Sequence, residues 1–138
     1  MKITVESGML NNLLVAVGGA MGAVLRYRVA LAMKSFWPGY AASGTLIVNV
    51  IGSLIIGYYL GISHESKSVS EAAKLFFIVG VVGGLTTFSS LAYETVALTH
   101  THQMGFTAGL GHLSANLILG LGAVFLGAWL GRESPPNP

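Results

Sequence analysis

The sequence contains no cysteine, and charged residues make up only 9% of it. Without cysteine, a disulfide framework and any metal site built from thiolates are excluded. Ordinary soluble domains carry roughly 25% charged residues, so this chain has too few ionisable groups to cover a water-facing surface. It also has no P-loop motif and no long basic run. No nucleotide-driven pump is therefore indicated, and no nucleic acid partner is expected.

Apolar residues are in excess, at 53% of 138 residues. A bilayer core of about 30 Å is crossed by a helix of around 20 apolar residues, and four stretches reach that length. We predict an all-α integral membrane protein with one four-span domain over 1–138. The first stretch lacks a convincing cleavage site for a signal peptide and is interpreted as a span. The expected spans cover approximately 10–33, 45–62, 72–98 and 106–130, followed by a tail over 131–138.

The basic residues are almost evenly divided between the two sides of the predicted membrane domain. An even number of spans places both chain ends on one side, and the positive-inside rule normally produces a clear bias. Two interpretations stay open: the chain inserts in both orientations, or a single residue such as Lys74 decides its orientation. One side collects Lys2, Lys67, Lys74 and Arg132, and the other collects Arg26, Arg28 and Lys34.

Residues 83–90 of the third span read Gly-Gly-Leu-Thr-Thr-Phe-Ser-Ser. Glycine lowers helix stability by about 1 kcal/mol relative to alanine, and hydroxyl side chains compete for backbone hydrogen bonds. We predict that this helix is broken near the bilayer midplane. A break there frees backbone groups for an ion. The alternative is a simple kink whose backbone groups are satisfied by the hydroxyls of Thr86 and Thr87.

Four further polar side chains fall within the predicted spans. A carboxylate in a membrane, such as Glu94, is a functional candidate by default, unless it lies in an aqueous vestibule. Asn49 and Asn116 each offer two amide donors, which either bind an anion or bond a neighbouring helix. For Asn116 we favour the bond to a helix. We expect Arg26 to end the helical part of the first span and to snorkel or line a vestibule.

Three linked motifs lie along the sequence: residues 18–22 with Arg26 and Tyr27, residues 44–53, and residues 83–89 with Glu94. Together they resemble the Fluc (CrcB-type) fluoride channel family. Their order and spacing cover positions from about 10 to 130, which is nearly the whole chain. The resemblance implies a fluoride-selective passive channel that exports fluoride and relieves its toxicity. It also implies a multi-pass protein of the inner (plasma) membrane without enzymatic activity.

The resemblance implies a dual-topology assembly as well. Two subunits would form an antiparallel homodimer, with a heterodimer as the other arrangement, and fluoride would pass along the subunit interface. A structural sodium ion, distinct from the conducted ion, would lie on the dimer axis. Carried over to this sequence, the backbone carbonyls of Gly83 and Thr86 would hold that sodium.

Fluoride is small and strongly hydrated, so a fluoride pathway must replace its water with hydrogen-bond donors. Asn49 and the serine hydroxyls offer such donors, and Phe88 offers the positive edge of its ring. Glu94 matches a family carboxylate near the entrance. The fluoride pathway implied by the resemblance comprises Asn49, Phe88, Ser89, Ser90, Leu91, Glu94 and Ser114, with Arg26 in the vestibule.

Leu91 is the one departure from the family pattern, which usually has a second phenylalanine there. Leucine keeps the volume but loses the polarised ring edge. Three interpretations follow: the pore works with one phenylalanine and an aliphatic partner, a second subunit supplies the missing ring in a heterodimer, or the channel conducts poorly. We favour the first, because the other motif residues are present.

Two other classes of protein compete with a channel. Small proton-coupled exporters share the four spans but depend on a carboxylate in the first span, and this sequence has none there after Glu6. A non-conducting partner subunit would need no broken helix. A metal site at His100, His102 and His112 is disfavoured against interfacial histidines that titrate near neutral pH.

Overall fold

The computed structural model describes residues 5–40, 42–64, 69–100 and 105–132, and all regular structure within these ranges is helical. Four helical runs are long and apolar enough to cross a membrane, over Gly8–Phe36, Ser43–Ser63, Glu71–Thr99 and Gly105–Gly131. The prediction of an all-helical chain with four spans is therefore confirmed. The elements are α1 (Val5–Phe36), the 3-10 turn η1 (Pro38–Tyr40), α2 (Ser43–His64), α3 (Glu71–Ala73), the π-helical η2 (Lys74–Val82), α4 (Gly83–Leu85), α5 (Phe88–Thr99) and α6 (Gly105–Gly131).

Helix α1 runs without interruption past Arg26 to Phe36. The expectation that Arg26 ends the helical part of the first span is wrong. Arginine is a good helix former, and its long side chain can carry the charge away from the helix while the backbone hydrogen bonds continue. A charged residue can therefore mark where the apolar stretch of a span ends, but it does not end the helix.

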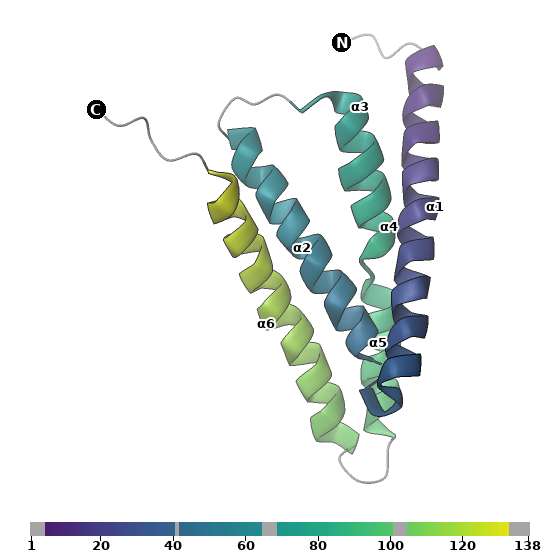
Figure 1. Ribbon diagram of the computed structural model, residues 1–138, viewed down its shortest axis with the longest axis vertical. Helices are drawn as coiled ribbons and strands as arrows, with labels where there is room; N and C mark the ends of the chain where they lie inside the picture. The colour runs from purple at the N-terminus through teal and green to yellow at the C-terminus, as the bar shows by residue number, and fades with distance from the viewer. Residues whose placement is uncertain (1–4, 41, 65–68, 101–104, 133–138) are drawn as a thin grey trace, which may run out of the picture.

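The helices form two neighbouring pairs (Figure 1). Helix α1 packs along η2 and α4, while α2 packs along α6, and α6 also contacts α5. The first residues of α1 and the last residues of α6 lie at the same end of the molecule. The third span thus contributes its first half to one pair and its second half, α5, to the other.

Glycine allows the backbones of both pairs to touch. A Cβ atom on Gly18 of α1 would collide with the carbonyl of Phe76, and one on Gly80 would meet the backbone of Gly18. Gly57 of α2 and Gly127 of α6 face the partner helix's backbone in the same way. Close approach through small residues is how helices associate in lipid, where no hydrophobic force drives them together.

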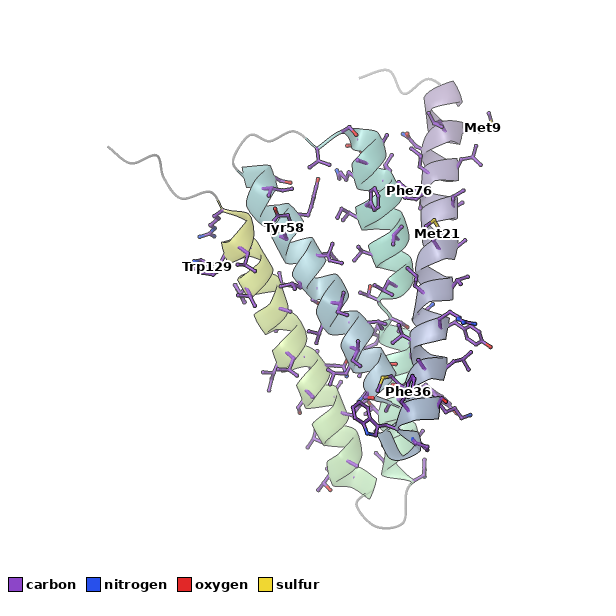
Figure 2. All side chains as sticks on the ribbon, viewed as in Figure 1. Met9, Met21, Phe36, Tyr58, Phe76 and Trp129 are labelled. Carbon is purple, nitrogen blue, oxygen red and sulfur yellow. The ribbon has the colours of Figure 1, made fainter. Side chains whose placement is uncertain are left out.

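The outer surface of the molecule is apolar. Met9, Met21 and Phe36 project away from α1, and Trp129 projects away from α6 (Figure 2). Fully buried apolar side chains are few by comparison and include Val48 and Val82. A soluble monomer rarely exposes so much contiguous apolar surface, so this surface is suited to lipid.

Candidate functional site

The third span is interrupted at Thr86 and Thr87, which lie between the end of α4 and the start of α5. Both residues have extended backbone conformations, with φ and ψ of −76° and 153° at Thr86 and of −155° and 125° at Thr87. The hydroxyl of Thr86 donates to the carbonyl of Val82 at 3.1 Å, and the hydroxyl of Thr87 accepts from the Ser90 N–H at 3.1 Å. The hydroxyls thus take over part of the hydrogen bonding that the helix loses here.

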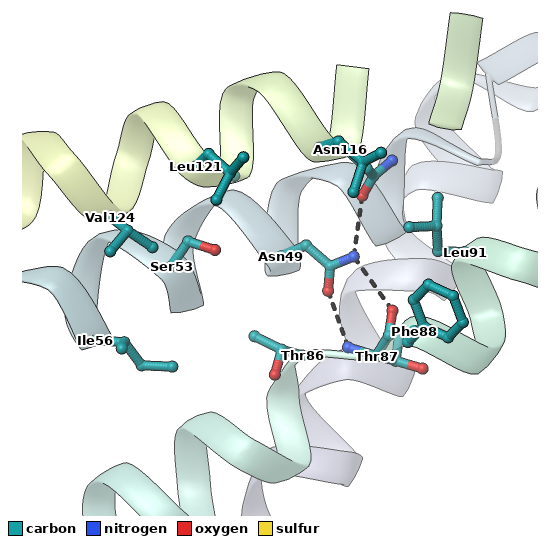
Figure 3. A pocket seen from close by; sticks show the side chains of 12 residues that line it. Asn49, Ser53, Ile56, Thr86, Thr87, Phe88, Leu91, Asn116, Leu121 and Val124 are labelled. Atoms are coloured by element: carbon teal, nitrogen blue, oxygen red, sulfur yellow. Dashed lines mark hydrogen bonds between the residues drawn. The ribbon is translucent and has the colours of Figure 1, made fainter. Parts of the chain in front are cut away.

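Asn49 of α2 holds the interruption in place from the side (Figure 3). Its Oδ1 accepts from the Thr87 N–H at 2.9 Å, and its Nδ2 donates to the Thr87 carbonyl at 3.2 Å. One amide side chain therefore pairs with both backbone polar groups of a single extended residue. In lipid the N–H would otherwise be unsatisfied, whereas the carbonyl, at the N-cap of α5, also accepts the first hydrogen bond of that helix.

Two backbone carbonyls lose their regular helix partners at the interruption. In a continuous α-helix the carbonyl of Gly83 would accept from the Thr87 N–H, and that of Thr86 from the Ser90 N–H. Here the Thr87 N–H bonds Asn49, and the Ser90 N–H bonds the Thr87 hydroxyl. The carbonyls of Gly83 and Thr86 are thus released from the helix ladder, and Gly83 is exposed on the surface of the chain.

A groove of about 330 Å³ opens beside the interruption, between α2, α6 and the start of α5. Its polar groups come from Asn49, Ser53, Thr86, Thr87 and Asn116, and Phe88 and Leu91 lie at its edge (Figure 3). Phe88 is 75% exposed, whereas Leu91 is only 4% exposed. Among the described residues, no charged side chain lines the groove, so its polar character comes from neutral amides, hydroxyls and backbone groups.

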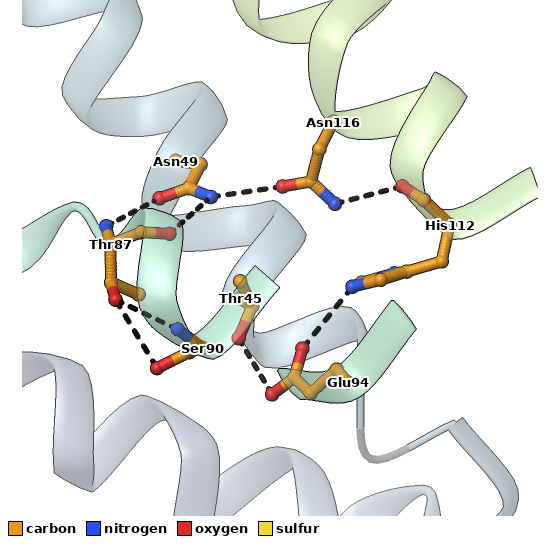
Figure 4. Close-up of polar contacts among 7 residues, drawn as sticks. All are labelled: Thr45, Asn49, Thr87, Ser90, Glu94, His112 and Asn116. Atoms are coloured by element: carbon orange, nitrogen blue, oxygen red, sulfur yellow. Dashed lines mark hydrogen bonds and ion pairs between the residues drawn. The ribbon is translucent and has the colours of Figure 1, made fainter. Parts of the chain in front are cut away.

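A chain of amides runs from α2 across the groove to α6 (Figure 4). The Nδ2 of Asn49 donates to Oδ1 of Asn116 at 2.9 Å, and Nδ2 of Asn116 donates to the carbonyl of His112 at 3.0 Å. Asn116 therefore bonds a neighbouring helix, as expected from the sequence. Neutral amides in series both accept and donate, so the chain has hydrogen-bonding capacity without a fixed charge.

Glu94 stands at the far end of this network, outside the residues that line the groove. Its Oε1 accepts from the hydroxyl of Thr45 at 2.8 Å, and its Oε2 lies 3.2 Å from Nε2 of His112. The side chain of His112 is only 7% exposed. The expectation of an interfacial histidine is therefore wrong for His112, because the imidazole is turned inward between α5 and α6. His102 lies outside the described residues.

The predicted site residues fall into three groups. Asn49, Phe88 and Leu91 line the groove together with Thr86. Ser89 and Ser90 lie beside it, with their hydroxyls 3.1 Å and 3.3 Å from the Thr87 hydroxyl. The remaining candidates do not line the groove: these are Arg26 of α1, Gly83, Glu94 and Ser114 of α6.

Sequence reasoning missed Thr45 and His112 as members of the polar network, and it named Thr87 only for its hydroxyl, which accepts from the Ser90 N–H as expected. A signal for two of them was present, because Thr45 lies four residues before Asn49, and His112 four residues before Asn116. Residues four apart share one face of a helix. Two such polar pairs in otherwise apolar spans indicate two polar faces. Which faces meet depends on how the helices pack.

Comparison with known proteins gives consistent matches along the chain. The model of the family described as CrcB-like protein, Camphor Resistance (CrcB), matches residues 13–128. A protein of Roseiflexus sp. (strain RS-1) named fluoride-specific ion channel FluC is 44% identical over 91% of this chain and 100% of its own length. Proteins of the same name from Thermus thermophilus and Clostridium perfringens are 48% and 38% identical, over 86% and 88% of this chain and 93% and 90% of their own lengths.

Proposed function

The chain belongs to the CrcB-like family, and on that premise we propose that it forms a passive, fluoride-selective ion channel that exports fluoride and relieves its toxicity. The observation that carries this proposal is the neutral polar groove beside the interrupted third span. Fluoride must exchange its hydration shell for hydrogen-bond donors when it leaves water. A conduction site must also bind weakly enough to release the ion. Neutral amides and hydroxyls meet both requirements.

Asn49 and Phe88 are the residues that we propose at the centre of the pathway. The Nδ2 of Asn49 donates to Thr87 and Asn116, and its Oδ1 accepts from Thr87. A fluoride ion would therefore enter an existing hydrogen-bond network. The edge of an aromatic ring carries partial positive charge, and Phe88 presents its ring at the mouth of the groove. The hydroxyls of Ser89 and Ser90 would extend the pathway from Thr87.

We propose that Leu91 acts as an aliphatic wall of this pathway. The side chain of Leu91 is buried among residues of its own chain and forms one side of the groove, whereas the ring of Phe88 is exposed. A pathway with one aromatic ring per chain would then be sufficient. The specific alternative is a heterodimer in which a second subunit supplies another phenylalanine.

A second copy of the chain, inserted in the opposite orientation, is the arrangement that we propose for the working channel. Gly83 and Phe88 are both exposed on the isolated chain, and a partner would cover them and close the groove. The almost even division of basic residues between the two ends permits both orientations. The interruption lies roughly halfway along the span Glu71–Thr99, so we place it near the midplane of the inner (plasma) membrane.

The released carbonyls of Gly83 and Thr86 fit a sodium ion. Carbonyl oxygens are hard ligands of the kind that such cations prefer, and an antiparallel pair of chains would bring two from each subunit to the dimer axis. A sodium held there would stabilise the interface and would not be conducted. If so, replacing sodium with a bulky organic cation during purification should lower the stability of the dimer. Unchanged stability would contradict this part of the proposal.

The purified chain, reconstituted alone in liposomes, tests the channel directly with a fluoride electrode and chloride as the control anion. We expect rapid fluoride efflux in the absence of a proton gradient, which a proton-coupled exporter would not give. Phe88→Ile should abolish it. Phe125→Ile is the matched control, because Phe125 is equally exposed at 75% but does not line the groove. A chain that folds but releases no fluoride would refute the homodimer and favour a partner subunit.

A further inference from the structure

Helix α2 also contacts the interruption at Gly52, which follows Asn49 by three residues. Gly52 is buried, and a Cβ atom on it would overlap the Cγ2 methyl group of Thr86. The next nearest atoms, Cγ1 of Val82 and Cβ of Thr86, would lie 3.4 Å and 3.7 Å away, which is ordinary contact. The Thr86 methyl group therefore occupies the space that a side chain at position 52 would need, and Gly52 forms a notch for it.

The hydroxyl of Thr86 fixes the direction of that methyl group. Its Oγ1 donates to the Val82 carbonyl at 3.1 Å, and the Thr86 N–H donates to the same oxygen at 3.0 Å. Threonine is branched at Cβ, so a hydroxyl held on one side sets where the methyl group points. In lipid the hydroxyl has no water to bond instead. The methyl group therefore cannot turn out of the Gly52 notch unless this hydrogen bond is lost.

Gly52 and Asn49 act on consecutive residues of the interruption. They are three residues apart and so share one face of α2, which Thr86 and Thr87 approach from the third span (Figure 3). Asn49 bonds the backbone of Thr87 through its amide, whereas Gly52 limits how closely the side chain of Thr86 can approach. A close-packed contact tolerates little change in volume. The amide thus holds the interruption to α2, and the notch sets its distance from α2.

A change of that distance would reach the groove. Thr86 and Thr87 both line it, whereas Gly52 does not. An added methyl group at position 52 would push the interruption away from α2, because overpacking in a tight contact is relieved by shifts of the backbone. Such a shift would lengthen the hydrogen bonds between Asn49 and Thr87. It would also change the spacing of the polar groups that a fluoride ion would meet.

We propose that Gly52 is a positioning residue for fluoride conduction, which acts through the Thr86 methyl group and holds the interruption at the distance from α2 that the groove requires. This inference rests on the proposed channel function. The other glycines of α2 have different neighbours. A Cβ on Gly44 would meet Ala30 of α1, and a Cβ on Gly57 or Gly61 would meet backbone atoms of α6. Gly52 is therefore the glycine of α2 that faces the third span.

The test moves one methyl group across the contact. Thr86→Ser removes the methyl group and keeps the hydroxyl that bonds Val82, so combining it with Gly52→Ala conserves the packed volume. Fluoride efflux from liposomes is measured for the full chain and divided by the amount of folded protein from size-exclusion chromatography. We expect Gly52→Ala to lower the rate per folded channel at least about tenfold. The double variant should recover to within about threefold of Thr86→Ser or exceed it. Thr86→Ser should not raise the rate of Gly57→Ala, the matched control, whose Cβ would meet Val124.

Each outcome decides the matter. A Gly52→Ala chain with the wild-type rate per folded channel overturns the inference, even if less of it folds, because the contact is then only structural. A double variant that is no faster than Gly52→Ala also overturns it and leaves the channel intact. If Gly52→Ala does not fold, the double variant decides, since it should fold and conduct. Its failure to do either overturns the proposal. A wild-type chain without efflux contradicts the channel function itself.

Discussion

The interface of α1 with η2 and α4 differs from the interface of α6 with α2 and α5 in the groups that meet. In the first, glycines such as Gly18 and Gly80 bring one backbone against the other. In the second, glycines such as Gly57 and Gly127 occupy one end, and amides, hydroxyls and the Glu94–His112 pair occupy the other.

The difference shows how a small membrane protein divides its tasks between helix pairs. Dispersion between close backbones holds the first pair together, and such a contact leaves no room for a side chain or an ion. The second pair accepts polar side chains, which are expensive in lipid unless each is satisfied. The polar end is therefore where function can be located, while the glycine contacts supply rigidity.

The largest effect is expected where a polar side chain supports the backbone. Asn49→Leu leaves the N–H of Thr87 without a partner, at about 1–3 kcal/mol, and removes the side-chain bond to the Thr87 carbonyl. We expect fluoride efflux to be lost and the folded fraction in detergent to fall. Ser53→Ala, which also lines the groove, is the control and should conduct. A conducting Asn49→Leu chain would show that the interruption does not need this amide.

A smaller loss of stability should follow from one methyl group in the glycine interface. A Cβ on Gly18 collides with the backbone of η2, whereas a Cβ on the adjacent Gly19 meets nothing within 4 Å. We expect Gly18→Ala to lower stability by about 1–3 kcal/mol through overpacking. Gly19→Ala should be neutral or stabilising by up to about 1 kcal/mol. Thermal unfolding monitored by size-exclusion chromatography compares the two, and equal midpoints would contradict the close contact.

Thr45→Val removes one hydrogen bond from the polar end and keeps the shape of the side chain. The hydroxyl of Thr45 donates to Glu94, and a typical bond of this kind contributes about 1 kcal/mol. We expect a loss of that size in thermal unfolding. Ser63→Ala removes an exposed hydroxyl that bonds its own helix, and it should change little. Identical behaviour of both variants would mean that Thr45 does not position Glu94.

Leu91→Phe should have the smallest effect on transport. Leu91 is buried at the edge of an open groove, so a larger ring can extend into that groove. If one phenylalanine per chain is sufficient, the efflux rate should stay within about threefold of the wild-type rate. That corresponds to a change of less than about 1 kcal/mol in the barrier to conduction. A rise of about tenfold, close to 1.4 kcal/mol in barrier height, would instead indicate that the natural chain lacks a ring which a partner normally supplies.

Much of the fold could be read from the sequence, whereas the site could be read only in part. The lengths of the apolar stretches predicted the four spans to within a few residues of their observed ends. The continuation of α1 past Arg26 was missed, because a charged residue at a membrane surface does not break helix hydrogen bonding. Asn49, Phe88 and Leu91 were named from motifs, and they lie together at the groove.

By itself the sequence determined how many helices cross the membrane, where they can approach closely, and which polar residues share a helix face. These are local properties, set by hydropathy, residue size and helical period. Only the tertiary structure decided that the face with Thr45 and Asn49 meets the faces with Glu94, His112 and Asn116. The rotation of each helix about its axis depends on the packing of all of them, because a polar group in lipid is stable only where another helix presents its partner.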